Sequence, residues 1–117
     1  MIKTIAITGA GSGIGQAIAK TLAENGYSLI LLGRNATALK KTREQLKNPD
    51  AHQCFSCDIR EPKKLRDVLV ESQVETLLAV VANAGVGGEN HYGNGNRWQE
   101  IIDTNLSGSY YTVQECL

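Results

Sequence analysis

Hydrophobic and polar positions follow two alternating periods along the chain, and this alternation predicts strands and helices in turn. Short apolar runs bounded by glycine or polar residues predict strands over 2–8, 28–32, 52–56 and 76–82. Such continuous runs are typical of strands buried on both faces. Between the runs, apolar residues recur at helical spacing and predict helices over 13–25, 36–47 and 62–71, with a long final helix from Trp98 to Val113.

The order of these elements predicts the fold class. A strand followed by a helix, four times over, predicts an α/β protein with a Rossmann-type doubly wound parallel sheet of about four strands and four helices. Ligands of such sheets bind at the carboxyl ends of the strands, where the strand order reverses. Glycine or polar clusters follow the predicted strands at residues 9–15, 33–34, 58–59 and 83–85. We therefore expect one domain, residues 1–117, with these clusters on one rim.

Charge and hydropathy exclude several partners. Twelve basic and twelve acidic residues balance, so no overall field attracts the chain to nucleic acid or to an anionic membrane. No apolar run approaches the roughly 20 residues that a membrane-spanning helix needs. The apolar start, residues 2–7, is too short for a signal peptide and runs into glycine. We expect a cytoplasmic protein.

The cysteines form one short motif. Cys54 and Cys57 are a C-x-x-C pair, which suggests redox chemistry or half of a zinc site. A structural zinc site needs four ligands, and the remaining candidates are Cys116, His52 and His91. Positions three apart in a strand point to opposite faces. We therefore expect reduced cysteines, at least one of them in the core, and no metal.

A glycine-rich loop follows the first predicted strand and leads directly into a helix. Thr8, Gly9, Gly13 and Gly15 form the pattern T-G-x-x-x-G-x-G. The N–H groups and positive dipole end of the helix create an anion site, and glycines let a pyrophosphate approach the backbone. Gly9 would permit the tight turn, Gly13 the close contact, and Gly15 the packing of helix on strand. The alternative is a purely structural turn.

The end of the second predicted strand indicates which dinucleotide would bind. NAD-binding folds place an acidic residue about 20 positions after the glycine motif, to hold the ribose hydroxyls. Here Gly33 and Arg34 stand at that place. A guanidinium binds a 2′-phosphate by charge-assisted hydrogen bonds, whereas a carboxylate repels it. The sequence thus favours NADP (NADPH) over NAD, unless Arg34 is simply a solvent-facing arginine.

Five segments occur together in a familiar order. They are "TGAGSGIG" (8–15), "GRN" (33–35), "CDIRE" (57–61), "NAG" (83–85) and "DTNLSG" (103–108). With them the chain resembles the N-terminal half of a short-chain dehydrogenase/reductase, without the C-terminal strands of that family. The resemblance implies an NADP-dependent oxidoreductase that transfers hydride between the cofactor and a small-molecule carbonyl or alcohol.

The same resemblance assigns the phosphate-binding residues. The pyrophosphate and the adenosine ribose would be held by Gly9, Ser12, Gly13, Ile14 and Gly15. Arg34 and Asn35, with Ser12, would meet the 2′-phosphate.

Further residues are assigned in the same way. Asp58 would accept a hydrogen bond from the adenine amino group, with the Ile59 backbone beside it. Asn83, Ala84 and Gly85 would form the floor of the site and tie neighbouring strands. Asn105 would be the catalytic asparagine, which interrupts the long helix and holds a water in a proton relay. The alternatives are a helix cap for Asp58, a turn for Asn83 and a surface position for Asn105.

The chain departs from the family at the proton donor. Family members use a serine and a tyrosine with lysine four places later, because a phenol needs a nearby cation to titrate near neutrality. The four tyrosines here are followed at that place by Leu31, Asn96, Gln114 and Glu115. We therefore expect a fragment that lacks these catalytic residues, with two alternatives: a non-catalytic NADP(H)-binding or regulatory module, or a structural fragment with an empty loop.

The fourth predicted strand would stand at an open edge of the sheet. An uncovered apolar edge strand invites pairing with another chain. We therefore expect association with further copies, as a homo-oligomer, or folding only in contact with the missing portion.

Overall fold

The computed structural model describes residues 2–84 and 103–116. Within these ranges four parallel strands form one sheet: β1 (Thr4–Thr8), β2 (Ser28–Gly33), β3 (Gln53–Ser56) and β4 (Ala79–Val81). Their order is β3-β2-β1-β4. The chain thus moves outward from β1 to β3 and then returns to the other side of β1, so the strand order reverses between β1 and β4. The predicted doubly wound sheet is confirmed.

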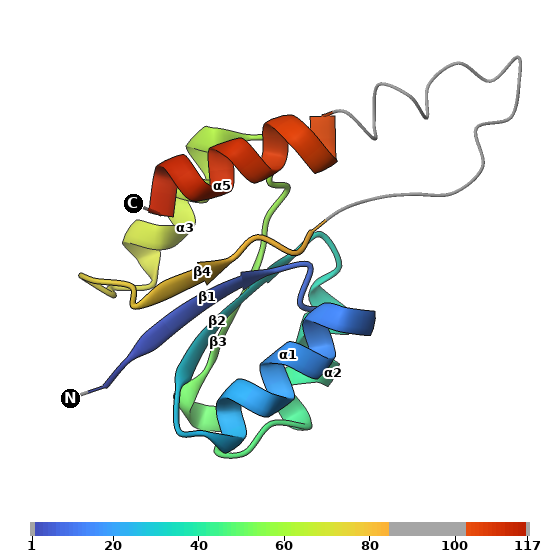
Figure 1. The fold of residues 1–117 in the computed structure, drawn as a ribbon, viewed down its shortest axis with the longest axis vertical. Helices are drawn as coiled ribbons and strands as arrows, with labels where there is room; N and C mark the ends of the chain where they lie inside the picture. The colour runs from blue at the N-terminus through green and yellow to red at the C-terminus, as the bar shows by residue number, and fades with distance from the viewer. Residues whose placement is uncertain (1, 85–102, 117) are drawn as a thin grey trace, which may run out of the picture.

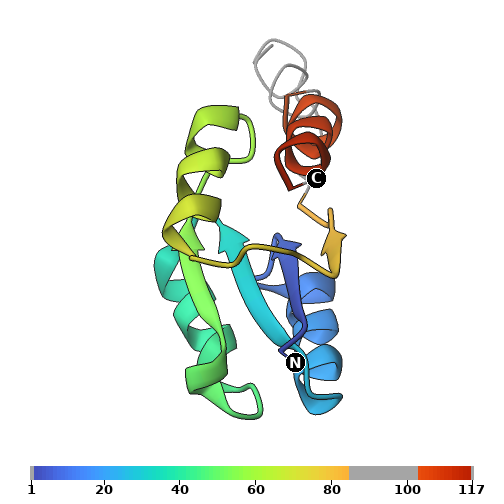
Figure 2. The same ribbon diagram turned by 90° about the vertical axis from the view of Figure 1, so that its left-hand side faces the viewer.

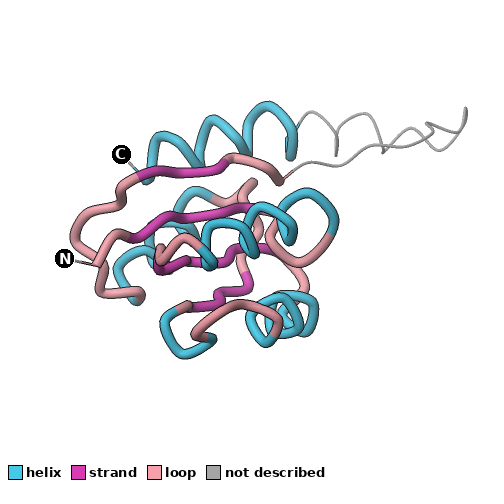
Figure 3. The backbone as a smooth tube through the Cα atoms, turned by 60° about the horizontal axis from the view of Figure 1, so that its bottom comes forward, coloured by secondary structure: helices cyan, strands magenta, loops and turns pink. Residues whose placement is uncertain are grey.

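Helices cover both faces of the sheet. Helices α1 (Gly13–Glu24) and α2 (Ala36–Glu44) lie on one face, and α3 (Pro62–Glu71) and α5 (Ser109–Cys116) on the other (Figures 1 and 2). Figure 3 shows the four strands side by side between these layers. This three-layer arrangement is what the alternation of strand and helix predicts.

Side chains of the central strands divide between two cores. Ile5 and Ile7 of β1 pack towards α1 and α2, whereas Ala6 packs towards the opposite face. All five residues of β1 and the middle four of β2 are buried. Burial of each large apolar side chain stabilises the fold by about 1.5–3 kcal/mol. The carboxyl ends of β1 and β2 are therefore firmly fixed in position.

The predicted start of the first strand and both predicted limits of the fourth strand are wrong, whereas the first strand ends at Thr8 as predicted. The first strand begins at Thr4 rather than Ile2, whose side chain is 80% exposed. The fourth spans three residues instead of 76–82, and it pairs with β1 alone among the described strands. Leu78 N–H donates to Thr4 O at 2.8 Å, so β4 can pair only from the point where β1 begins. The edge position of β4 agrees with the sequence.

Two other elements are shorter than predicted. Helix α2 ends at Glu44 instead of residue 47, because the next two N–H groups bond to carbonyls three residues back, which tightens the last turn. A single 3₁₀ turn, Pro49–Ala51, then precedes β3, which begins at Gln53 instead of residue 52.

The final helix is not regular. A π-helical segment, Asp103–Gly108, precedes α5. Such segments interrupt a helix by one wider turn, so the interruption implied for Asn105 is present at that residue. The part predicted over residues 98–102 lies outside the described residues.

The cysteines are unpaired, as predicted. Cys54 packs with the α1–α2 core and Cys57 with the opposite core, so the two do point to different faces. Cys57 itself follows β3 and is not part of it. Burial, with the charges of Asp58 and Glu61, raises the pKa of the Cys57 thiol to about 11. This thiol therefore stays protonated near neutral pH.

The helices described are all too short, or too polar, to cross a bilayer. Among residues 2–84 and 103–116, no three His, Cys, Asp or Glu side chains gather as a metal site would require.

Candidate functional site

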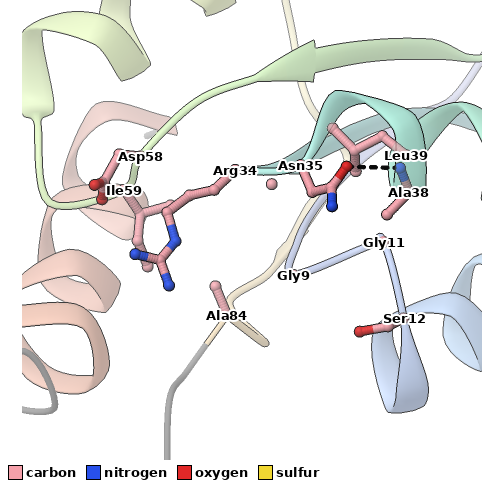
Figure 4. A pocket seen from close by; sticks show the side chains of 11 residues that line it. Gly9, Gly11, Ser12, Arg34, Asn35, Ala38, Leu39, Asp58, Ile59 and Ala84 are labelled. Atoms are coloured by element: carbon pink, nitrogen blue, oxygen red, sulfur yellow. Dashed lines mark hydrogen bonds between the residues drawn. The ribbon is translucent and has the colours of Figure 1, made fainter. Parts of the chain in front are cut away.

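A cavity of about 390 Å³ lies at the carboxyl ends of β1 and β2 (Figure 4). Its lining comes from the loop after β1, the end of β2 with the start of α2, the turn after β3 and the segment after β4. The lining residues are Gly9, Gly11, Ser12, Gly33, Arg34, Asn35, Ala38, Leu39, Asp58, Ile59 and Ala84. The structure thus brings together all four of the clusters that the sequence places on one rim.

The glycines of the loop are required by its geometry. Gly9 and Gly13 have φ angles of +65° and +54°, in the left-handed region that favours glycine. A Cβ at Gly9 would lie 2.9 Å from Ala84 Cα, and one at Gly15 would overlap Gly9 O. A Cβ at Gly13 would meet no atom within 4 Å. Gly13 therefore leaves open space beside the backbone, as a closely approaching ligand needs.

The N-terminus of α1 faces this space. Ser12 is the N-cap residue, with extended backbone angles, and its hydroxyl makes no capping hydrogen bond. In Figure 4 that hydroxyl points from the start of α1 towards the cavity. The first-turn N–H groups of a helix lack intrahelical partners and carry the positive end of its dipole. This end of α1 can accept an anion, with the Ser12 hydroxyl beside it.

Ile14 could contact a ligand of this cavity only through its backbone. Its side chain is 73% exposed and is not among the residues that line the cavity. Its N–H group belongs to the first turn of α1, which is the part a phosphate would contact.

Arg34 and Asn35 form the opposite wall. The Asn35 Oδ1 accepts a hydrogen bond from Ala38 N at 3.0 Å and so caps α2. Its Nδ2 is then the group left to donate towards a ligand. In Figure 4 the Arg34 side chain, which lines the cavity, extends from the end of β2 towards Asp58. A guanidinium in this position places a permanent positive charge at the end of β2.

Asp58 is an ionised acceptor. Hydrogen bonds from the Arg60 side chain hold the pKa of its carboxyl below the usual range, and the more distant charge of Arg34 acts in the same direction. The shortest of these bonds joins Arg60 Nη2 to Asp58 Oδ2 at 2.6 Å. Both oxygens already accept from Arg60, through its backbone N–H, Nε and Nη2, so a ligand donor would share an oxygen with these groups.

The helix-cap alternative for Asp58 is wrong. The N-cap of α3 is Glu61, and the Asp58 carboxylate bonds to Arg60 N instead. Ile59, beside it, is buried and packs into the α3–α5 core.

Asn83 and Ala84 tie the ends of β4 and β1. Asn83 Nδ2 donates to Gly9 O at 3.4 Å, and Ala84 N donates to Thr8 Oγ1 at 2.9 Å. The Thr8 hydroxyl in turn donates to Val81 O. These bonds fix the loop after β1 against the segment after β4. Gly85, the third residue of the cluster, lies outside the described residues.

Asn105 is not brought into this cavity. It lies on the π-helical segment ahead of α5, where it is exposed, and it is absent from the cavity lining. Its predicted position at an interruption of the helix agrees with the structure; its catalytic role stays a prediction.

Three lining residues were missed by the sequence reasoning. Gly11 belongs to the loop, and a Cβ there would lie 3.0 Å from Ala38 Cβ. Ala38 and Leu39 come from the first turns of α2. A signal existed for each, because Gly11 lies inside the glycine motif and α2 follows Arg34 and Asn35 directly.

The sequence profile described as short chain dehydrogenase matches residues 3–117. The chain belongs to the short-chain dehydrogenase family. An uncharacterised oxidoreductase of Staphylococcus epidermidis is 34% identical over 98% of this chain and 51% of its own length. The chain thus spans about half the length of the curated relatives it matches.

Solved structures of the family superpose closely on this chain. A short-chain type dehydrogenase/reductase from Mycobacterium marinum matches with a TM-score of 0.87 and 28% identity, over 97% of this chain and 48% of that one. Carveol dehydrogenase from Mycobacterium avium, in complex with NAD, gives the same TM-score, identity and shares of the two chains. Short-chain dehydrogenases are oxidoreductases that bind nicotinamide cofactors, and the cavity described above has the glycine loop, helix N-terminus and acceptor that such a ligand needs.

Proposed function

We propose that residues 1–117 are the dinucleotide-binding domain of an NADP-dependent oxidoreductase of the carbonyl reductase or alcohol dehydrogenase type. The observation that supports the choice of NADP is the Arg34 side chain in the lining of the cavity, at the position where NAD-binding folds carry a carboxylate. A doubly ionised 2′-phosphate would form charge-assisted hydrogen bonds with this guanidinium.

The residues of this chain fit the parts of the cofactor in order. The first-turn N–H groups of α1 and the open space at Gly13 would receive the pyrophosphate. Arg34, with Asn35 Nδ2 and the Ser12 hydroxyl, would hold the 2′-phosphate. The Asp58 carboxylate would accept from the adenine amino group, and Asn83 and Ala84 keep the floor of the site in place.

The chemistry is divided between this chain and residues that its sequence does not contain. When bound, the nicotinamide ring supplies or accepts the hydride. Asn105 would hold a water in the proton relay, but an amide does not titrate near neutral pH and is no proton donor. No tyrosine of the chain has a lysine four places later. We therefore assign to these 117 residues cofactor binding, and to the whole protein hydride transfer to a small-molecule carbonyl or from an alcohol.

A second candidate function is a non-catalytic NADP(H)-binding or regulatory module. The observation in its favour is that the binding cavity is assembled while the Tyr-x-x-x-Lys pair is absent from the sequence. Both functions require cofactor binding by this chain.

The decisive measurement is calorimetric titration of the chain with NADPH and NADH. We expect tighter binding of NADPH, and Arg34→Asp should weaken or reverse the preference. Loss of a charge-assisted hydrogen bond costs about 1.5–3 kcal/mol, or about 10- to 150-fold in affinity. Arg43→Asp, on α2 and outside the cavity lining, makes the same change of charge and is the matched control. Equal affinities of the wild-type chain for both cofactors would remove Arg34 from this role.

Turnover distinguishes binding from catalysis. The 117-residue chain should bind NADPH without oxidising it in the presence of simple ketones, since no tyrosine of its sequence has the lysine four places later that would lower the pKa of a phenol. The measurement is the loss of NADPH absorbance over hours, beside a sample without ketone. Steady ketone-dependent oxidation would show that the chain contains an acid that we have not identified.

A further inference from the structure

The middle of the glycine loop is held from two sides through Ala10. This residue is completely buried. Its N–H group donates to Leu32 O at 3.2 Å, and its carbonyl accepts from Thr42 Oγ1 at 2.9 Å. Leu32 lies two residues before Arg34, and Thr42 lies on the helix that follows Arg34. These two hydrogen bonds therefore join the loop to β2 and α2, and the opposite wall of the cavity lies between these two elements.

The Thr42 hydroxyl has a fixed direction. Thr42 is completely buried, and Gln16 Nε2 on α1 donates to its Oγ1 at 3.3 Å. A hydroxyl has one hydrogen to donate. Because the Gln16 amide nitrogen can only donate, the Thr42 hydrogen is directed to Ala10 O. The network joins α1, the glycine loop and α2 through one side chain.

We propose that Thr42 is a positioning residue that holds the glycine loop in the shape that aims the N-terminus of α1 into the cavity. Ala38, one turn before Thr42 on α2, lies against Gly11 and supports the loop at a second point. The expected effect of Thr42 on NADPH affinity rests on the proposed function, whereas its expected effect on the order of the loop does not.

Packing alone would not select threonine here. Valine has the same shape, and a buried valine is better tolerated than a buried hydroxyl unless the hydroxyl is hydrogen-bonded. Thr42→Val would leave the Ala10 carbonyl buried without its donor, which costs more than loss of the bond in water. Thr42→Ser keeps the hydroxyl and removes one methyl group. The two variants therefore separate a hydrogen-bonding role from a packing role.

The first test needs no ligand. Amide hydrogen exchange of the loop residues 10–13 is measured in the full chain by NMR, with the amides of β2 as a reference for global opening. We expect exchange in the loop about five- to tenfold faster in Thr42→Val, and near the wild-type rate in Thr42→Ser. Equal loop rates in Thr42→Val and wild type, or equally fast rates in both variants, would overturn the proposal.

A second variant covers the case in which Thr42→Val does not fold. Gln16→Glu places a carboxylate acceptor beside Thr42, and this acceptor would draw the hydroxyl hydrogen away from Ala10 O. It creates no cavity in the core. Faster loop exchange is expected again, and loop exchange at the wild-type rate would overturn the proposal.

The consequence for binding is measured by titration with NADPH. We expect affinity about five- to tenfold lower in Thr42→Val and within about twofold of wild type in Thr42→Ser. Unchanged affinity in Thr42→Val would overturn the link between loop and binding. A wild-type chain that fails to bind NADPH would instead overturn the proposed function, and the exchange rates would still decide whether Thr42 holds the loop.

Discussion

The two faces of the sheet are held by different kinds of interaction. On the α1–α2 face, the glycine loop is fixed by buried backbone contacts and by the buried Thr42 hydroxyl. On the other face, Leu65 of α3 and Tyr111 of α5 belong to one hydrophobic core, and an ion pair between the exposed Arg66 and the mostly buried Glu115 joins the two helices with hydrogen bonds of 3.0 and 3.1 Å. The exposure of Arg66 to water limits what this ion pair contributes to stability.

The two faces also differ in their proposed roles, which are cofactor binding and catalysis. Most of the cavity lining comes from the α1–α2 side, with Asp58, Ile59 and Ala84 added by the turn after β3 and the segment after β4, whereas Asn105 lies on the segment that leads into α5. Burial also differs between neighbouring strands: β1 is buried throughout, whereas β4 is exposed or half-buried. The binding part of the site is thus set by core packing, and perturbation of α5 should leave it largely intact.

The largest expected effect is on the fixed face. Gly15→Ala would force a Cβ into Gly9 O, a backbone atom, and to 2.7 Å from Asn83 Nδ2. We expect a loss of about 3 kcal/mol in the free energy of unfolding, the upper end for overpacking. Gly13→Ala is the matched control, because its Cβ has open space and only the left-handed φ costs about 1–2 kcal/mol.

Urea denaturation measures both variants, and NADPH titration follows for those that fold. Gly13→Ala should keep most of its stability but lose affinity, since its methyl group occupies the space left for the ligand. Equal losses of stability in the two variants would show that the loop is not packed as described.

The glycines show what sequence reasoning can achieve here. Local backbone needs restrict residue type strongly, so the tight turn at Gly9 and the close packing at Gly15 could be assigned before the structure, whereas the contact of Gly13 with a ligand stays a prediction. Arg34 could be placed in the same way, because alternating elements bring strand ends to one rim. The glycine predictions depend only on residues close in sequence, and the prediction for Arg34 depends only on the topology of the sheet.

Other features depend on contacts that no local pattern reveals. The start of β4 is set by where β1 begins, more than 70 residues earlier in the chain. The bond from Thr42 to Ala10 joins residues 32 apart, and helical periodicity places Thr42 only on a buried face. The capping alternative for Asp58 was open for a different reason: the sequence does not show at which residue α3 begins, and this decides which residue is its N-cap.

A smaller effect is expected from pH on the weakly held face. The hydrogen bonds from Arg66 lower the pKa of Glu115 from its ordinary value of 4.5. A folded-state pKa below the unfolded one stabilises the fold above the unfolded value, and this contribution is lost as the pH falls through the folded value. Stability should therefore decrease below about pH 4.5, and Glu115→Gln should reduce that decrease.

The measurement is urea denaturation between pH 3 and pH 7. Glu44→Gln, which removes an exposed glutamate of α2, is the control and should leave the pH dependence nearer to wild type. Part of the dependence should remain in Glu115→Gln, because the lowered pKa of Asp58 acts with the same sign. A profile identical in Glu115→Gln and wild type would show that the ion pair does not hold α5 in solution.

The smallest expected effect tests the separation of the two faces directly. Asn105 is exposed and absent from the cavity lining, so Asn105→Ala should change the affinity for NADPH by less than about twofold, or about 0.4 kcal/mol. Loop exchange at residues 10–13 should also stay at the wild-type rate, because the bonds that hold the loop come from α1, α2, β2 and the segment after β4. Titration of Asn105→Ala beside Arg34→Asp gives the contrast in one experiment. A comparable loss in both variants would mean that the π-helical segment reaches the bound cofactor and that binding and catalysis share the weakly held face.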